Sequence, residues 1–268
     1  QRLMLAVLAV CGTSAALAQS SVTVYGRVNT TIERQKIGDE SVTGMFNNSS
    51  RIGFKGVEDL GGGLKAGFQL EAGFGSDTGA GGAAGGGINF ARQSEVNLAG
   101  NWGMLRLGNF TAESYYATAD YISMHNHDTG SSSDALYVYG LPSDANKISY
   151  RTPEMGGFWA EVAHQFGEKA ALEKDVGTPA VTIAGHYKNG WDLAGNYNNG
   201  PLGLGLGYSQ SSAYFPGQAS EKVQQLGLRA SYAIGALTLG GYYQYAKATE
   251  GDDSAKRHAV RLAAMYTL

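Results

Sequence analysis

The 268-residue chain contains few cysteines, few prolines and few charged residues, and each shortage excludes a class of protein. The only cysteine, Cys11, lies in an N-terminal segment with the features of a cleaved signal sequence, so the mature chain would have neither a disulfide nor a thiol nucleophile. Five prolines are too few for a proline-rich disordered segment. Charged residues make up 16% of the chain, and the formal net charge of −3 gives no electrostatic reason to expect a nucleic acid partner.

Long hydrophobic runs are also missing from most of the chain. The N-terminus has Arg2, an apolar run over residues 3–10 and the small-residue tripeptide Ala-Leu-Ala at 16–18, which is the order of a secretory signal peptide. We therefore predict a signal peptide at residues 1–18. A transmembrane helix is the alternative, but the run is too short to cross about 30 Å of hydrocarbon. No later stretch approaches the length of a transmembrane helix, so any membrane span must consist of β-strands.

Alternating apolar and polar side chains are what the chain has in quantity. In residues 22–32 the apolar residues share one face and the polar ones the other: Val22, Val24, Val28 and Ile32 against Thr23, Tyr25, Arg27 and Asn29. The same pattern returns in further segments, which brings the number of predicted strands to about twelve: 51–57, 64–74, 94–98, 104–108, 147–152, 158–166, 191–198, 202–208, 225–232, 237–245 and 260–268. Each segment is predicted to be a strand with one apolar face and one polar face.

The connections between these segments alternate in length. Short turns rich in Gly and Asn, such as 60–63 and 199–201, join pairs of strands. Longer connections separate the pairs: 35–48, 76–87, 111–146, 168–190, 211–221 and 250–254. This asymmetry is typical of an all-β transmembrane antiparallel β-barrel, with an apolar band facing outer-membrane lipid and a polar lumen. A soluble β-sandwich is disfavoured because the polar face carries Arg, Lys, Glu and Gln too regularly to pack against a second sheet.

The number of strands leaves two interpretations of how the barrel closes. Either about twelve strands form a complete barrel, or four C-terminal strands of a sixteen-stranded barrel are missing from the chain. Residues 265–268 lie within an alternating segment, and the last of them, Leu268, is not the closing aromatic residue of such a barrel.

Several motifs, in the same order along the chain, resemble those of the Gram-negative general diffusion porins of β-proteobacteria. They lie at 20–26, 50–66, 90–94, 107–108 and 148–150, and the longest reads Ser-Arg-Ile-Gly-Phe-Lys-Gly-Val-Glu-Asp-Leu-Gly-Gly-Gly-Leu-Lys-Ala. The resemblance implies a homotrimer of sixteen-stranded barrels in the outer membrane of a Gram-negative bacterium. It favours the second interpretation, in which this chain is C-terminally truncated and contains about twelve of the strands.

The resemblance also implies a domain organisation and a function. Residues 19–268 would form the porin barrel, and the third long connection, 111–146, would fold inward as a constriction loop. Small hydrophilic solutes and ions would cross a water-filled channel by passive diffusion, filtered by size and by the charges at the narrowing. Neither catalysis nor a cofactor is expected.

Candidate pore residues come from strand parity and from the resemblance. Parity places basic side chains on the inner wall: Arg27, Arg51, Lys55, Lys65, Arg106, Lys147 and Arg151. The constriction loop carries acids: Glu113, Asp120, Asp128 and Asp134. The resemblance matches pore-lining positions at Arg51, Glu71 and Arg92 and an inward-loop acid at Asp120.

The predicted pore-lining or constriction residues are therefore Arg27, Arg51, Lys55, Glu71, Arg92, Arg106, Glu113, Asp120, Lys147 and Arg151. Acids on the loop facing bases on the wall would create a transverse field, and Arg51 and Asp120 are expected to face each other across the narrowing. One residue conflicts with strict alternation, because Val96 and Leu98 on the outer face would place Arg92 outward. A β-bulge would restore its inward position.

Three further motifs suggest enzymes or metal sites, but each lacks a necessary part. Asp-Thr-Gly at 77–79 and 128–130 has no preceding hydrophobic strand. The two histidines at 125–127 have no third ligand nearby, and the glycine run at 79–87 has no Gly-Lys-Ser/Thr ending. We expect no enzyme. The alternative to a channel is an outer-membrane adhesin or surface antigen that uses the long loops, and liposome swelling separates the two because a plugged adhesin passes no sugar.

Overall fold

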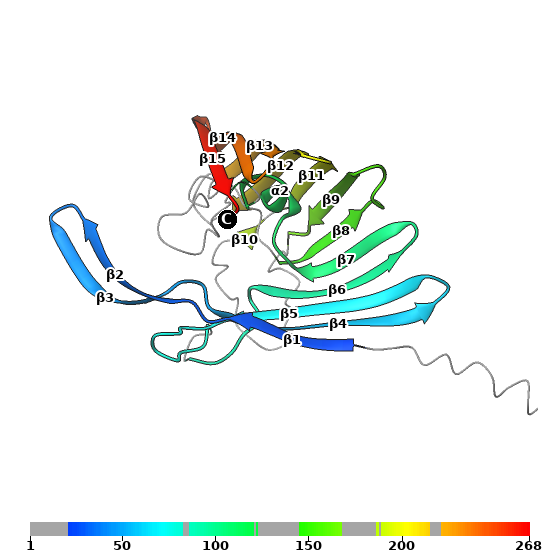
Figure 1. The fold of residues 1–268 in the computed structure, drawn as a ribbon, viewed down its shortest axis with the longest axis horizontal. Helices are drawn as coiled ribbons and strands as arrows, with labels where there is room; N and C mark the ends of the chain where they lie inside the picture. Colours follow the sequence, from blue (N-terminus) through cyan, green and yellow to red (C-terminus); the bar gives the residue numbers. More distant parts are fainter. Residues whose placement is uncertain are drawn as a thin grey trace, which may run out of the picture.

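The computed structural model describes residues 21–82, 86–120, 122, 145–167, 186–187, 189–214 and 221–268. The predicted signal peptide at 1–18 and the loop acids Asp128 and Asp134 lie outside them. Within the described residues, thirteen strands form one sheet, and twelve of them follow a single antiparallel path (Figure 1). The prediction of an all-β fold with about twelve strands is confirmed.

The first half of this path runs through β1 (Ser21–Arg27), β4 (Arg51–Gly61), β5 (Leu64–Gly73), β6 (Gln93–Gly100), β7 (Gly103–Asn109) and β8 (Lys147–Arg151). The second half runs through β9 (Phe158–Gln165), β11 (Gly190–Asn199), β12 (Leu202–Tyr214), β13 (Glu221–Ile234), β14 (Leu237–Glu250) and β15 (Asp253–Tyr266). A short strand, β10 (His186–Tyr187), pairs with β12 beside this path.

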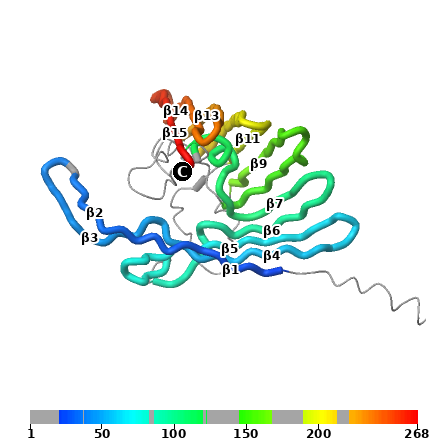
Figure 2. The backbone as a smooth tube through the Cα atoms, in the orientation of Figure 1, coloured from blue at the N-terminus to red at the C-terminus, as the bar shows by residue number. Residues whose placement is uncertain are grey.

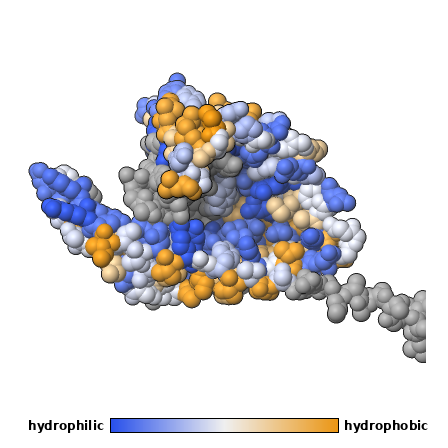
Figure 3. Space-filling model, in the orientation of Figure 1, coloured by the Kyte–Doolittle hydropathy of each residue, from blue (hydrophilic) through white to orange (hydrophobic). Residues whose placement is uncertain are grey.

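The sheet is curved, and it has an inner and an outer face. Figure 1 shows the strands curling, with the helix α2 (Glu113–Tyr115) on the concave side of the sheet. Figure 2 shows the same curvature of the backbone. The π-helical turn η1 (Tyr116–Asp120) follows α2 and contacts β12 and β13. We call the face toward this helix the inner face. Figure 3 shows hydrophobic side chains along the outer margin over β1 and β4, and hydrophilic ones next to them on the side toward the middle of the molecule. None of the helices in the described ranges is long and apolar enough to cross a membrane.

Polar residues are buried on the inner face, and apolar residues are exposed on the outer face. In β13 and β14, Gln225 and Gln244 are each 1% exposed. On the outer face Leu206 is 48% exposed and Leu228 is 44% exposed. This is the reverse of the order in a water-soluble protein, in which large apolar side chains are usually buried. The predicted alternation is confirmed here, because successive side chains of a strand point to opposite faces.

The first long connection contains a hairpin that was not predicted. Residues 22–32 were expected to form one strand and 35–48 a loop, but the chain forms β2 (Thr30–Ile37) and β3 (Glu40–Asn47), which pair with each other as a separate two-stranded sheet. Asn29 interrupts the first strand, since its carbonyl accepts from the Asn48 amide at 2.9 Å and its own amide donates to the Ser50 hydroxyl at 2.8 Å. Both faces of the hairpin contain polar residues, which concealed the alternation.

Two other connections are shorter than predicted. β12 continues to Tyr214, so the predicted connection at 211–221 begins later, and 250–254 is reduced to a tight turn between β14 and β15. Gly251 has a φ of 56° in that turn, a conformation that glycine adopts without steric cost. The last three strands consequently extend beyond the predicted segments at the end where the long connections lie.

Candidate functional site

The inserted helix packs against the inner face of β11, β12 and β13. Ser114, Thr118 and Ala119 are completely buried in this contact. The carboxylate of Asp192 on β11 holds the start of the helix, because it accepts from the Ser114 amide at 3.0 Å and also from the Ser114 hydroxyl. The chain after β7 is thus fixed to β11, three strands further along the sheet.

Glycines on the inner face of β12 allow the helix backbone to lie directly against the strand. A Cβ atom on Gly205 would lie 2.0 Å from the carbonyl oxygen of Ala117, and one on Gly207 would lie 2.5 Å from that of Ser114. Both distances are too short for any side chain, so only glycine fits there. The prediction used the Leu-Gly repeat at 202–207 only as evidence for a strand, although three glycines on one face also indicate a close backbone approach.

A network of buried ion pairs lies where the chain enters the helix. On β7, Arg106 contacts three carboxylates, with distances to Glu95, Glu161 and Glu113 of 2.7, 3.2 and 3.7 Å. Arg151 on β8 contacts Glu161 at 2.7 Å and also Glu113. The helix is therefore joined electrostatically to β7 and β8 as well as packed on β12.

Two members of this network were not among the predicted pore residues. Glu95 and Glu161 face inward because the register places Glu95 beside Gln69 and Glu161 beside Arg151. Strand parity would have found both acids, since they alternate with the outward Val96 and Val162.

Burial of this network affects its protonation and its packing. Burial raises the pKa of Glu113 to about 7, because loss of solvation outweighs the attraction of the guanidinium groups of Arg151 and Arg106.

The Phe110 ring contacts two cations of this region: its centre lies 4.1 Å from the Arg106 guanidinium and 4.8 Å from the Lys147 ammonium. Such cation–π contacts further fix the arginine in place.

A second charged cluster lies on β1, β4 and β5, and it is richer in arginine. The carboxylate of Glu71 contacts Arg92 at 2.7 Å and Arg51 at 3.8 Å. The Tyr25 hydroxyl donates to the same carboxylate at 3.0 Å. The register places Arg27 directly opposite Arg51, so the described part of this cluster contains three guanidinium groups and one glutamate. We call Arg27, Arg51, Arg92 and Glu71 the arginine cluster.

The structure explains how Arg92 reaches this cluster without the expected β-bulge. Arg92 lies at a bend one residue before β6 begins at Gln93, so the parity of the strand does not apply to it. Its side chain then bends toward Glu71 on the inner face.

The remaining predicted residues are placed as follows. Lys55 lies over the Tyr25 ring, 5.4 Å from its centre, and is exposed. Lys147 is 3% exposed and lies against the Phe110 ring. Asp120 ends η1, but its side chain and residues 123–144 lie outside the described part of the chain, so the expected approach of Asp120 to Arg51 stays a prediction.

Three further arginines lie on the inner face of the strands at the other end of the sheet. Arg229 donates to the Leu204 carbonyl at 2.7 Å and the Asn196 side chain at 3.1 Å. Arg257 and Arg261 follow from the register of β15, where they pair with the inward Ala246 and Tyr242. The predicted strand at 260–268 already placed Val260 and Leu262 on one face, so parity alone could have identified Arg261.

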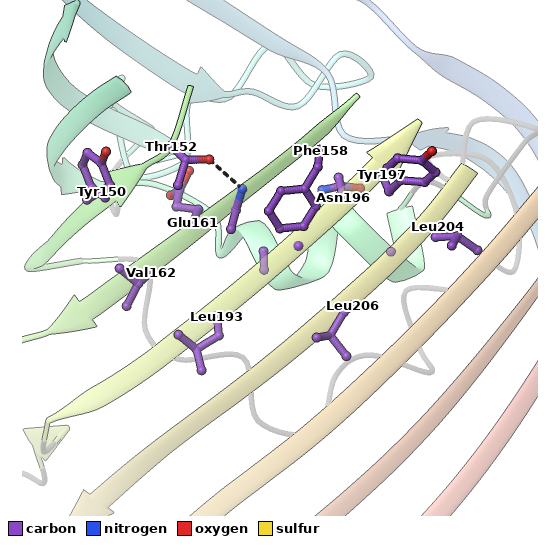
Figure 4. Close-up of a pocket in the computed structure, with 14 residues that line it drawn as sticks. Tyr150, Thr152, Phe158, Glu161, Val162, Leu193, Asn196, Tyr197, Leu204 and Leu206 are labelled. Carbon is purple, nitrogen blue, oxygen red and sulfur yellow. Dashed lines mark hydrogen bonds between the residues drawn. The ribbon is translucent and has the colours of Figure 1, made fainter. Parts of the chain in front are cut away.

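A hollow of about 480 Å³ on the outer face is not part of this site. Figure 4 shows that it lies across β9, β11 and β12, with Val162, Leu193 and Leu206 around it. The small residues Ala160 and Gly195 leave the space between these larger side chains. Its lining is almost entirely apolar, as expected of a lipid-facing surface.

A curved antiparallel sheet with an apolar outside, a charged inner face and a helix inserted against that face defines the wall of a membrane channel. The chain belongs to the Gram-negative porin family, whose model matches residues 5–268. The protein is accordingly an outer-membrane protein and not an enzyme.

Named relatives agree with this assignment. The chain is 37% identical to outer membrane porin protein 32 of Delftia acidovorans, over 91% of this chain and 68% of the relative. It is 32% identical to an outer membrane porin protein of Bordetella pertussis, over 88% of this chain and 66% of the relative. The chain thus spans about two thirds of the length of these relatives.

Solved structures show the same fold. An anion-selective porin from Comamonas acidovorans superposes with a TM-score of 0.68 at 29% identity, over 92% of this chain and 74% of that one. The OmpF protein of Salmonella typhi superposes with a TM-score of 0.56 at 14% identity, over 92% of this chain and 86% of that one, which is similarity of fold alone.

Proposed function

We propose that the protein forms a water-filled channel through which small hydrophilic solutes and ions cross the outer membrane by passive diffusion. The observation that carries this proposal is the helix held against the inner face of a sheet whose outer face is apolar. A polar lumen removes the cost of transferring charge into hydrocarbon, and an inserted segment narrows the passage. Residues 111–146 serve as the constriction loop, residues 1–18 as the signal peptide, and three copies assemble as a homotrimer, which family membership supports.

The charges on the wall support a preference for anions. The acids near the helix are engaged by Arg106 and Arg151, whereas the arginine cluster has three guanidinium groups and one carboxylate. Guanidinium groups beside an aqueous passage attract anions and repel cations. The relative of known structure titled as anion-selective is consistent with this preference.

The residues that we propose to line the pore or its constriction are Arg27, Arg51, Lys55, Glu71, Arg92, Arg106, Glu113, Asp120, Lys147 and Arg151. In this proposal the arginine cluster acts on passing ions, and the network of Arg106, Arg151 and Glu113 positions the loop.

Planar bilayers and liposomes test the channel directly. The full-length protein, refolded into trimers that dissociate on heating, should give single-channel conductance and should make liposomes swell in small sugars. Correctly refolded protein that neither conducts nor passes sugar would overturn the channel and would favour the adhesin, whose lumen is plugged.

A further inference from the structure

The ring of Tyr25 lies flat on the inner face of the sheet, against the backbone of Gly53. The register pairs these two residues across β1 and β4. A Cβ atom on Gly53 would lie 2.4 Å from the Cζ atom of Tyr25 and 2.6 Å from both its Cε1 atom and its hydroxyl oxygen. A position beyond the ring edge would be farther from Cζ than from these two neighbours, so Gly53 lies under the face of the ring. Only glycine leaves room there for an aromatic ring against the wall.

Two hydrogen bonds hold the Tyr25 ring in this orientation. Its hydroxyl donates to the Glu71 carboxylate at 3.0 Å and accepts from the side-chain amide of Gln69 at 2.7 Å. Both partners lie on β5, so the side chain reaches from β1 across β4 to the next strand of the sheet. A ring that is already fixed in place loses little conformational freedom when a solute packs against it.

The second face of the Tyr25 ring is open toward the lumen. Another tyrosine on the inner face, Tyr242 on β14, is 3% exposed because it packs against Ala119 and Ile122 of the inserted segment. Tyr25 is only half-buried, and the face that rests on Gly53 is the covered one. Its exposed area therefore lies on the side of the pore, where a passing solute can reach it.

Cations lie next to this ring. The ammonium group of Lys55, an exposed side chain, lies over the ring at 5.4 Å from its centre. Glu71 accepts from Tyr25 through Oε2, and its Oε1 contacts Arg92 at 2.7 Å and Arg51 at 3.8 Å. These two arginine side chains are 39% and 25% exposed, so water in the lumen reaches them. We call Tyr25, Lys55, Arg51 and Arg92 the aromatic–cation site.

We propose that the aromatic–cation site binds small planar aromatic carboxylates, which stack on the Tyr25 ring while Lys55 and Arg51 hold the carboxylate group. This inference rests on the proposed channel and names a class of anion that the channel favours. Stacked aromatic rings attract each other beyond the burial of their area, and hydrogen bonds from cations to a carboxylate are strong. A carboxylate without a flat ring gains only the second interaction. The site is a weak one on the path of conduction, because a solute that binds tightly in a pore does not leave it.

Two anions of equal charge and ring size, benzoate and cyclohexanecarboxylate, test the proposal. Only benzoate is flat and aromatic. The full-length protein in planar bilayers carries a chloride current, and each anion is added until it halves that current. The half-blocking concentration should be about two- to tenfold lower for benzoate, which is the fold-change that corresponds to one aromatic stacking contact.

Variants of Tyr25 assign this ratio to the ring. Tyr25→Leu removes the ring and should bring the two half-blocking concentrations together, whereas Tyr25→Phe keeps the ring and should keep the ratio. Any change in the charges around Glu71 affects both anions equally, so the ratio isolates stacking. Tyr208→Leu is the matched control, because Tyr208 lies on the outer face of β12, and it should leave the ratio unchanged.

Gly53→Ala tests the geometry without altering the tyrosine. The new Cβ atom would lie 2.4 Å from the ring and must displace it, so the ratio should fall toward one. Gly195→Ala on the outer face is the control and should keep the ratio. If Tyr25→Leu does not refold, the comparison of Gly53→Ala with Tyr25→Phe gives the same information.

Equal half-blocking concentrations for the two anions in the unmodified protein would overturn the aromatic–cation site. A ratio that persists in Tyr25→Leu, or that is lost equally in Tyr208→Leu, would also overturn it. A channel that conducts chloride but does not distinguish the two anions would refute this inference and leave the proposed function standing. If the protein does not conduct, the proposed function fails, and saturation-transfer NMR of benzoate with the refolded protein decides on the site, since the signal of the benzoate ring should be lost in Tyr25→Leu.

Discussion

The two sides of the inner face use charge in different ways. On β1, β4 and β5 the arginine cluster is partly open to water, with the Arg51 and Arg92 side chains 25% and 39% exposed around Glu71. On β7 and β9, beside the start of the helix, Arg106 and Glu161 are almost completely buried and paired.

This difference separates two roles for arginine in one wall. A buried arginine whose charge is matched by neighbouring carboxylates holds structural elements together, because removing it would leave those carboxylates desolvated and unpaired. An arginine that is partly exposed to water contributes less to stability, and its charge acts on ions in the water beside it. Substitutions on the two sides should therefore differ in their effects on stability and on transport.

The largest expected effect is that of Arg106→Ala on the buried side. Its guanidinium lies between Glu95, Glu161 and Glu113, so the variant leaves buried carboxylates without their shared partner. Removing one partner of a buried ion pair costs about 3–5 kcal/mol of unfolding free energy, and we expect a loss of that order. Urea unfolding of refolded protein in micelles measures it. Arg51→Ala is the control, with an expected loss of about 0–1 kcal/mol; equal losses at both positions would contradict the distinction between the two sides.

A somewhat smaller loss is expected from Gly205→Ala, which tests whether the helix depends on the glycines of β12. The new Cβ would lie 2.0 Å from the Ala117 carbonyl oxygen, so the helix must move away from the strand. We expect a destabilisation of about 1–3 kcal/mol and a larger or noisier single-channel conductance.

Gly195→Ala is the matched control for this variant, because Gly195 lies on the outer face of β11 and its nearest neighbour would be a Phe158 ring carbon at 3.9 Å. Its effect should stay within about 0.5 kcal/mol. If Gly205→Ala behaved in the same way, the close contact between the helix and β12 would not be required.

The pH dependence of stability tests the protonation of Glu113. Its pKa in the folded protein, about 7, lies above the ordinary value of 4.5, so the folded state retains a proton that the unfolded state releases between these values. The contribution of Glu113 to the free energy of unfolding is therefore fully present below about pH 4.5. It is lost as the pH rises toward 7, by at most about 1.4 kcal/mol per pH unit. Glu161 and Asp192 oppose ionisation of Glu113, whereas Arg151 and Arg106 favour it.

Urea unfolding at about pH 5 and about pH 8 measures this slope. The unmodified protein should be less stable at the higher pH, and Glu113→Gln, which has no carboxyl group to titrate, should lose that component of the difference. Identical slopes in the two proteins would show that Glu113 does not carry the dependence.

The smallest effect on stability, and the clearest effect on transport, is expected on the exposed side. Arg51→Ala removes positive potential and should weaken anion preference, while Asp120→Asn removes negative potential and should strengthen it. Both shifts should shrink as ionic strength rises, because the screening length is about 8 Å in physiological salt. Reversal potentials under a salt gradient, at low and high ionic strength, measure them.

Lys36→Ala is the control for transport, since Lys36 lies on the β2–β3 hairpin outside the main sheet. It should leave the reversal potential nearly unchanged. Reversal potentials that do not change in either pore variant would remove Arg51 and Asp120 from the constriction without affecting the fold.

Much of the wall could be predicted from alternation, and most of its contacts could not. Parity correctly predicted that Arg106 points inward, and alternation within the predicted strands 202–208 and 225–232 agrees with the exposure of Leu206 and Leu228 on the outer face. It did not identify the hairpin of β2 and β3, because both of its faces are polar, and it misplaced Arg92, which lies outside the strand whose parity was applied to it. Parity also could not predict the contacts with the inserted helix, because alternation along a strand does not show which other segment packs against that face of the sheet.

The sequence by itself determined which residues form strands and which face of each strand is polar, because a period of two along the chain is a local property. The tertiary structure alone decided which charges meet. Arg106 and Glu161 are 55 residues apart, and Ser114 and Asp192 are 78 residues apart. These partners are brought together only when the strands pair in one register and the helix packs against the inner face. Inward arginines are therefore buried ion-pair partners on β7, at the start of the helix, and partly exposed charges on β4.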